Sequence, residues 1–93
     1  MAWTIELSKE VRKDLRKLDK QIAVKILAYL HKNIEGCLDP TEHGKHLSGD
    51  LSNLHRYRVG DYRIVCMIEY DRLVVVAIAV SHRKDVYKKL ILK

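Results

Sequence analysis

The sequence predicts an α+β fold in which a mainly antiparallel sheet of about four strands carries an N-terminal helical hairpin on one face. Across residues 9–34, apolar side chains recur at helical spacing in two consecutive blocks, which is typical of two amphipathic helices. Across residues 54–80, the chain alternates or runs apolar between turn-forming segments, which is typical of strands joined by hairpins. A short helix is expected at the C-terminal end.

Length and charge restrict the class of protein. The 93 residues suffice for one domain with a single two-layer core, which we place at residues 1–93. No apolar run approaches the roughly 20 residues that span a bilayer, and the start of the chain does not resemble a signal peptide, so a cytoplasmic protein is expected. The net charge of +6 favours a polyanionic partner, either nucleic acid or an acidic protein.

The N-terminal elements follow from caps and apolar spacing. A first strand is expected at Trp3–Leu7, Ser8 is a good N-cap for the first helix, and Asp19 is one for the second. The second helix is expected to end near Gly36. The apolar stripe of the first helix comprises Val11, Leu15 and Leu18, and that of the second comprises Ile22, Ile26, Leu27, Leu30 and Ile34.

The outer face of the first helix is basic, through Lys9, Arg12 and Lys13. Such a face is either an ordinary solvated surface or a secondary patch that follows a nucleic-acid backbone. We keep these three residues as candidate RNA contacts.

Residues 37–53 are rich in turn formers and predict a connecting loop. His43 and His46 lie in this stretch, but their spacing from Cys37 and Glu42 matches no zinc pattern, so no metal site is expected. Cys66 falls at a core-facing strand position and is interpreted as a small buried hydrophobe.

The most informative segment is a hairpin around Gly60 and Asp61, the dipeptide type of a tight turn. If these are the two loop residues, Arg58 lies directly across from Arg63. Because strand side chains alternate, Arg56 joins them on one face. The same face carries Val65 and Met67, and the opposite face carries Tyr57, Val59, Tyr62, Ile64, Cys66 and Ile68.

Two arginines placed directly opposite repel each other and destabilise a sheet. A phosphate-rich ligand is the simplest reason to keep them, and the alternative is three solvated side chains on an outer sheet face.

The register of the next two strands is predicted from the core pattern. A strand at Tyr62–Tyr70 and a second at Leu73–Val80 are joined by an odd loop, Tyr70–Arg72, if Val74, Val76, Ile78 and Val80 are to face the core. Ser81 and Arg83 then fall on the face of the arginines, with Arg83 near Arg58 and Arg63. Tyr87, in the terminal segment, comes within reach of the same end of the sheet.

The string from Arg56 to Ile64, followed by an apolar strand and then by His82–Tyr87, resembles the RelE toxins of the RelE/ParE superfamily, from prokaryotic type II toxin–antitoxin systems. The likeness extends over essentially the whole chain. It implies a strongly twisted sheet with helices on one face, and a ribosome-dependent endoribonuclease that cuts mRNA at the decoding site without a metal or other cofactor. It also implies a cognate antitoxin, through which alone the operator DNA is bound.

Residue by residue, the resemblance places the basic site positions on Arg56, Arg58, Arg63 and Arg83, and the near-terminal tyrosine on Tyr87. Arg58, Arg63 and Arg83 are expected to bind the scissile phosphate, with Arg56 on it or on the next one. Several relatives carry lysines at the positions of Arg56 and Arg58, and an arginine cannot replace a lysine as general base.

His82 is the only nearby residue of a type that exchanges protons near neutrality, so we add it to the catalytic set. Tyr87 either stacks on a base or acts as an acid. Lys84 is a further candidate RNA contact.

Two other functions stay open. ParE-like relatives poison DNA gyrase and generally lack the arginine and tyrosine near the C-terminus that Arg83 and Tyr87 provide here. Alternatively, the basic face belongs to a non-catalytic module that binds an acidic antitoxin or DNA.

Overall fold

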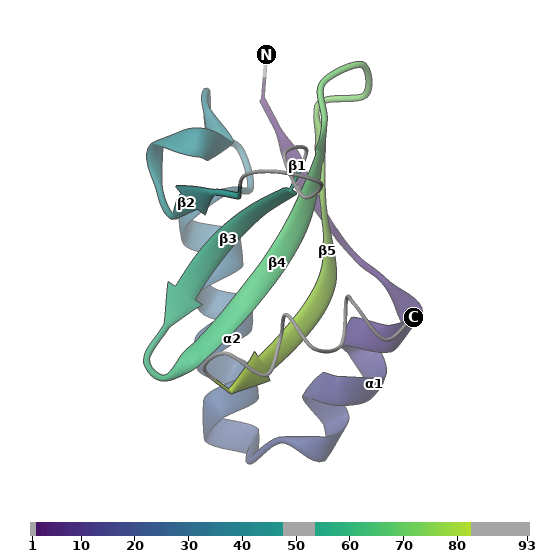
Figure 1. The fold of residues 1–93 in the computed structure, drawn as a ribbon, viewed down its shortest axis with the longest axis vertical. Coiled ribbons are helices and arrows are strands. Elements are labelled where there is room, and N and C mark those ends of the chain that lie inside the picture. Colours follow the sequence, from purple (N-terminus) through teal and green to yellow (C-terminus); the bar gives the residue numbers. More distant parts are fainter. Residues whose placement is uncertain (1, 48–53, 83–93) are drawn as a thin grey trace.

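The computed structural model describes residues 2–47 and 54–82. Two helices, a short 3-10 turn and five strands make up this part of the chain (Figure 1). They are β1 (Thr4–Leu7), α1 (Lys9–Lys17), α2 (Lys20–Asn33), the 3-10 turn Pro40–Glu42, β2 (Lys45–His46), β3 (Leu54–Val59), β4 (Tyr62–Glu69) and β5 (Val74–His82).

The strands form one sheet in the order β1-β5-β4-β3-β2, with β1 parallel to β5 and every other pair antiparallel. The predicted α+β class and mainly antiparallel sheet are confirmed. The sheet has five strands instead of about four because β2 lies in the stretch that was expected to be only a loop. The expected terminal helix lies outside the described residues.

Both helices begin where the sequence predicted. The Ser8 side chain accepts a hydrogen bond from the Val11 amide at 3.1 Å, and the Asp19 carboxylate accepts one from the Gln21 amide at 3.2 Å. Each cap satisfies a backbone donor that the first helical turn leaves without a partner. Within the described residues, no helix is long and apolar enough to cross a membrane.

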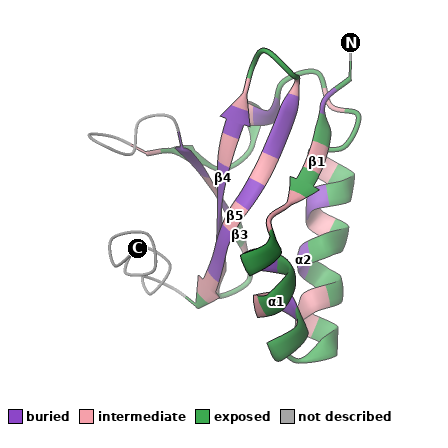
Figure 2. Cartoon of the chain, turned by 90° about the vertical axis from the view of Figure 1, so that its right-hand side faces the viewer, coloured by how far each residue is buried: buried purple, intermediate pink, exposed green. Residues whose placement is uncertain are grey.

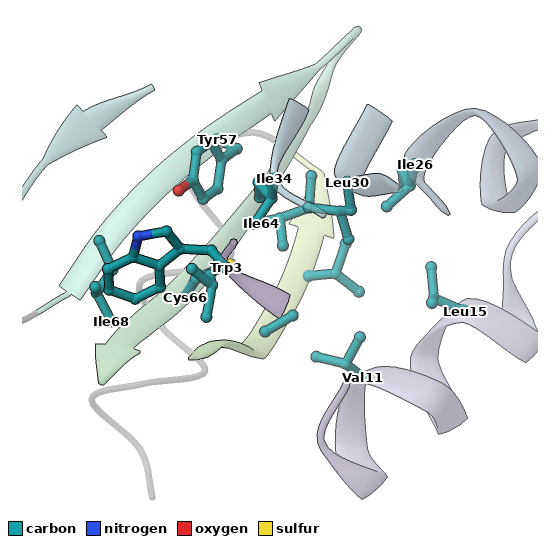
Figure 3. Close-up of a cluster of buried hydrophobic side chains, with 13 residues drawn as sticks. Trp3, Val11, Leu15, Ile26, Leu30, Ile34, Tyr57, Ile64, Cys66 and Ile68 are labelled. Atoms are coloured by element: carbon teal, nitrogen blue, oxygen red, sulfur yellow. The ribbon is translucent and has the colours of Figure 1, made fainter. Parts of the chain in front are cut away.

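Both helices cover the same face of the sheet (Figure 2). The helix residues Val11, Leu15, Ile26 and Leu30, with the C-cap residue of α2, Ile34, pack against sheet residues that include Tyr57, Ile64, Cys66 and Ile68 (Figure 3). Cys66 is fully buried, and burial raises the pKa of its thiol, so its interpretation as a buried hydrophobe is confirmed. Leu27, predicted in the apolar stripe, is instead 36% exposed.

The turn between β4 and β5 corrects the predicted register. It has four residues, Tyr70–Leu73, instead of three, because Leu73 adopts a left-handed conformation at φ 54° and Glu69 pairs with Val74. One extra loop residue exchanges the two faces of a strand. Val75 and Ala77 therefore enter the helix-covered core, where Val74 and Val76 were expected.

A bulge then reverses this exchange within β5. Cys66 pairs with Ala77 but its neighbour Val65 pairs with Ala79, so Ile78 is an extra residue without a partner in the ladder. Ile78 packs on the face away from the helices, contrary to prediction. Beyond the bulge the strand faces the core as predicted, and Val80 pairs with Ile64 there.

Candidate nucleic-acid interface

The arginine hairpin has the predicted geometry. Gly60, at φ 60°, and Asp61 form the turn, Val59 pairs with Tyr62, and Arg58 lies directly across from Arg63. Core burial of Tyr57 and Ile64 fixes which face of β3 and β4 meets the helices, so the arginines point to the other one.

We use the name arginine face for the side of the sheet away from the helices, which carries Arg56, Arg58, Arg63 and Ser81. Arg58 is exposed, Arg56 and Arg63 are half-buried, and Ser81 is the β5 partner of Arg63, as predicted. A guanidinium keeps its charge at any physiological pH and donates in a planar fork that matches phosphate oxygens. The arrangement can therefore bind polyanions.

The arginine face is apolar at the end of the strands away from the Gly60 turn. Val65 and Met67, which the sequence placed on this face, join a second cluster there with Leu54, Ala79, Leu47 and Ile78. Cationic side chains thus lie on the part of the face beside the turn, and apolar side chains cover the part farther from it.

His82 lies on the side opposite to the arginines. It pairs with Tyr62 and makes an edge-to-face ring contact with it, with ring centroids 5.1 Å apart, while its Nε2 is 3.9 Å from the Asp61 carboxylate. Alternation explains the placement, because Ser81 already occupies the arginine face. The predicted register, in which the even-numbered residues of this strand face the helices, implies the same position for His82.

The basic residues of α1 belong to another surface. Lys9, Arg12 and Lys13 are exposed on a helix that packs on the far side of the sheet. The helix that carries them therefore lies across the sheet from the arginine face. Arg83, Lys84 and Tyr87 lie outside the described residues.

Sequence reasoning missed one cation on the arginine face. In the antiparallel ladder of β2 and β3, Lys45 is the partner of Arg56, and partners in a ladder share a face. A strand of two residues leaves too short a pattern to be recognised from sequence.

Two buried side chains tie the segment before β2 to β3. Tyr57 donates its hydroxyl to the Pro40 carbonyl at 2.7 Å, and His55 hydrogen-bonds through Nε2 to the His43 carbonyl. Burial raises the pKa of Tyr57, so its hydroxyl remains a donor. Both rings are almost fully buried, which makes this link a rigid part of the site's frame.

A family model described as the ParE toxin of type II toxin–antitoxin systems matches residues 5–87. The chain belongs to this family. This family is part of the RelE/ParE superfamily, which the hairpin motif and the His82–Tyr87 segment together predicted.

Individual relatives of this toxin carry RelE-type names. Toxin RelG of Mycobacterium tuberculosis is 28% identical over 89 residues, covering 96% of this chain and all of the relative. The toxin–antitoxin complex RelBE2 from the same organism contains a chain with a TM-score of 0.79 and 26% identity, over 89% of this chain and 93% of that one. An E. coli RelE variant in the free state shares the fold, with a TM-score of 0.77 at 20% identity over 99% and 97% of the two chains.

His55 is expected to make the toxin's stability depend on pH. Burial lowers the pKa of His55 below its ordinary value of 6.5, the nearby charges of His46 and Arg56 act in the same direction, and the His43 carbonyl and Asp39 oppose them. The unfolded chain therefore binds more protons than the folded one just below pH 6.5. The contribution of His55 to the free energy of unfolding is therefore complete above pH 6.5 and is lost progressively as the pH falls from there through the lowered pKa of the folded state.

This prediction is checked by urea unfolding from about pH 7.5 to about pH 5.5. His55→Gln keeps an N–H donor for the His43 carbonyl but does not titrate, so it should lose less stability on acidification than the wild type. His55→Leu removes the donor and should be less stable throughout. Equal pH dependence in the wild type and His55→Gln would contradict the assignment.

Proposed function

We propose that this toxin is an endoribonuclease that cuts mRNA on the ribosome, with the arginine face binding the backbone of the message. The observation that carries the proposal is the direct pairing of Arg58 with Arg63, with Arg56 two residues along the same face. Guanidiniums placed opposite each other repel, and a phosphate bound between them attracts both.

The chemistry follows from what arginines can do. The 2′-hydroxyl loses its proton and its oxygen attacks phosphorus. A 2′-O–P bond forms, the P–O5′ bond breaks and the leaving 5′-oxygen takes up a proton, which gives a 2′,3′-cyclic phosphate and a free 5′-hydroxyl. Negative charge accumulates on the phosphorane oxygens in between. Guanidiniums at Arg58 and Arg63 stabilise that charge without a metal ion, since their donors are already oriented by the sheet.

Proton transfer is assigned to groups other than the arginines and His82. Arg56 and Arg58 cannot lose a proton, and the His82 ring packs on Tyr62 on the opposite face. We therefore assign Tyr87 either to protonation of the leaving oxygen or to stacking on a nucleobase. Arg83 is assigned a further contact to the scissile phosphate. The ribosome aligns the codon and supplies the remaining proton transfer.

The partners follow from the family and from the relatives. The structurally similar RelBE2 is a toxin–antitoxin complex. We infer a cognate antitoxin for this chain, with operator DNA bound only through the complex of the two. The ribosome and its mRNA are the targets, and both are met in the cytoplasm.

The test is primer extension on a defined mRNA in a translating extract. Discrete cuts within codons that appear only when ribosomes are engaged support the proposal. Because the chain belongs to the ParE toxin family, a parallel reaction contains gyrase and supercoiled plasmid. Intact mRNA with trapped, cleaved plasmid would favour gyrase poisoning, and no effect in either reaction would favour a binding module.

A further inference from the structure

The short edge strand β2 brings a lysine to the arginine face. Lys45 and His46 pair with Arg56 and His55, and the Leu47 amide extends the ladder by donating to the Leu54 carbonyl at 3.1 Å. Lys45 is exposed, so its ammonium group is open to a ligand. In a ladder, Cβ atoms of such partners lie about 4.5–5.5 Å apart, which places Lys45 beside Arg56.

The structure holds this strand firmly. Gly44, at φ 77°, allows the chain to pass so close to β3 that a Cβ there would overlap the Arg56 carbonyl oxygen. The hydrogen bonds that His55 and Tyr57 make to the His43 and Pro40 carbonyls fix the preceding residues. The backbone that carries Lys45 is therefore anchored at both ends.

The cations form two rows across the strands. Arg58 and Arg63 make the row nearest the turn, and Lys45 and Arg56 make the next. Residues two apart in a strand are separated by about 6.6 Å, which is comparable to the distance between successive phosphates of an extended single strand. Each row thus suits one phosphate.

No described carboxylate forms an ion pair with Lys45. Asp39, in the same segment, instead accepts hydrogen bonds from the backbone amide and the hydroxyl of Thr41. The competing explanation is that a lysine on an edge strand only prevents pairing with another chain. That role would not require the side chain to stand next to Arg56.

We propose that Lys45 is an RNA-binding residue of this toxin, and that with Arg56 it holds the phosphate adjacent to the one bound by Arg58 and Arg63. The inference rests on the proposed function of the arginine face. Lys45 positions the message and takes no part in proton transfer.

The experiment measures binding of a single-stranded RNA with 2′-O-methyl groups, which the toxin cannot cut, over a series of salt concentrations. Lys45→Gln should weaken binding about 3–10-fold and lower the slope of log K against log salt by about 0.7, the value for one phosphate contact on a single strand. Lys45→Arg should retain the wild-type affinity and the wild-type salt slope. Lys32→Gln removes the same charge from an exposed site on α2 and should change neither.

A variant of the central site separates the two proposals. If Arg58→Gln weakens binding while Lys45→Gln matches Lys32→Gln, the role of Lys45 is overturned and the arginine face stands. If Arg58→Gln also matches Lys32→Gln, the proposed function of this face fails. Self-association of Lys45→Gln on gel filtration, with an unchanged salt slope, would identify the edge-protecting role and overturn the inference.

Discussion

Replacing Arg58 and Arg63 together by glutamine is expected to lower cleavage of ribosome-bound mRNA by about 10³-fold or more, since removing even one preoriented donor to a developing oxyanion commonly costs 10²–10³. Glutamine keeps an N–H donor and much of the side-chain length but loses the charge. The rate is measured in single-turnover reactions with programmed ribosomes, and growth arrest on induction should disappear in parallel.

The control for charge is Lys9→Gln with Lys13→Gln, which removes two positive charges from the exposed side of α1. This control should cleave nearly as well as the wild type. The arginine variant should still melt cooperatively, because both substituted side chains lie on the face of the sheet away from the helix-covered core. Wild-type cleavage by a folded Arg58→Gln, Arg63→Gln variant would remove the arginine face from the chemistry.

Gly44→Ala is expected to lower the free energy of unfolding by about 3 kcal/mol or more. An alanine there meets two penalties. Its φ of 77° lies in the left-handed region, and its Cβ overlaps the Arg56 carbonyl oxygen and lies 2.9 Å from Tyr57 Cδ1. The segment must move away from β3, and β2 moves with it. Chemical unfolding measures the loss.

Gly36→Ala is the matched control. Gly36 has a similar φ of 80° but no atom within 4 Å of an added Cβ, so only the backbone strain of about 1–2 kcal/mol remains. The difference between the two variants isolates the close approach of the Gly44 segment to β3. Equal losses would mean that this approach contributes little, and that β2 is not held as tightly as the contacts indicate.

Local rules accounted for much of the fold. The caps at Ser8 and Asp19, the Gly60 turn and the pairing of Arg58 with Arg63 depend on residues within a few positions of one another, and all were confirmed. The family also followed from this hairpin and from the segment beginning at His82. These features are readable because each has a short, strong signal.

Register in β5 shows where local rules fail. The core pattern of alternating valines predicted that the even-numbered residues face the helices along the whole strand. Instead, the four-residue turn shifts the pairing of β5 with β4 by one residue, and the bulge at Ile78 shifts it back. Val80 and Ser81 were therefore placed correctly through two errors that cancel. In a run in which nearly every residue is apolar, either face can be buried, and packing against the helices decides between them.

The sequence by itself determined that this chain carries a two-helix hairpin, an arginine hairpin and the motif of a type II toxin, since each depends on spacing along the chain. Only the tertiary structure decided that the basic residues of α1 lie across the sheet from the arginines, and that Lys45 lies on the same face as the arginines. The physical reason is that strand pairing and the packing of helices on the sheet decide which residues of different segments lie on one face. Both are contacts between segments far apart in sequence, and no local pattern of residues encodes them.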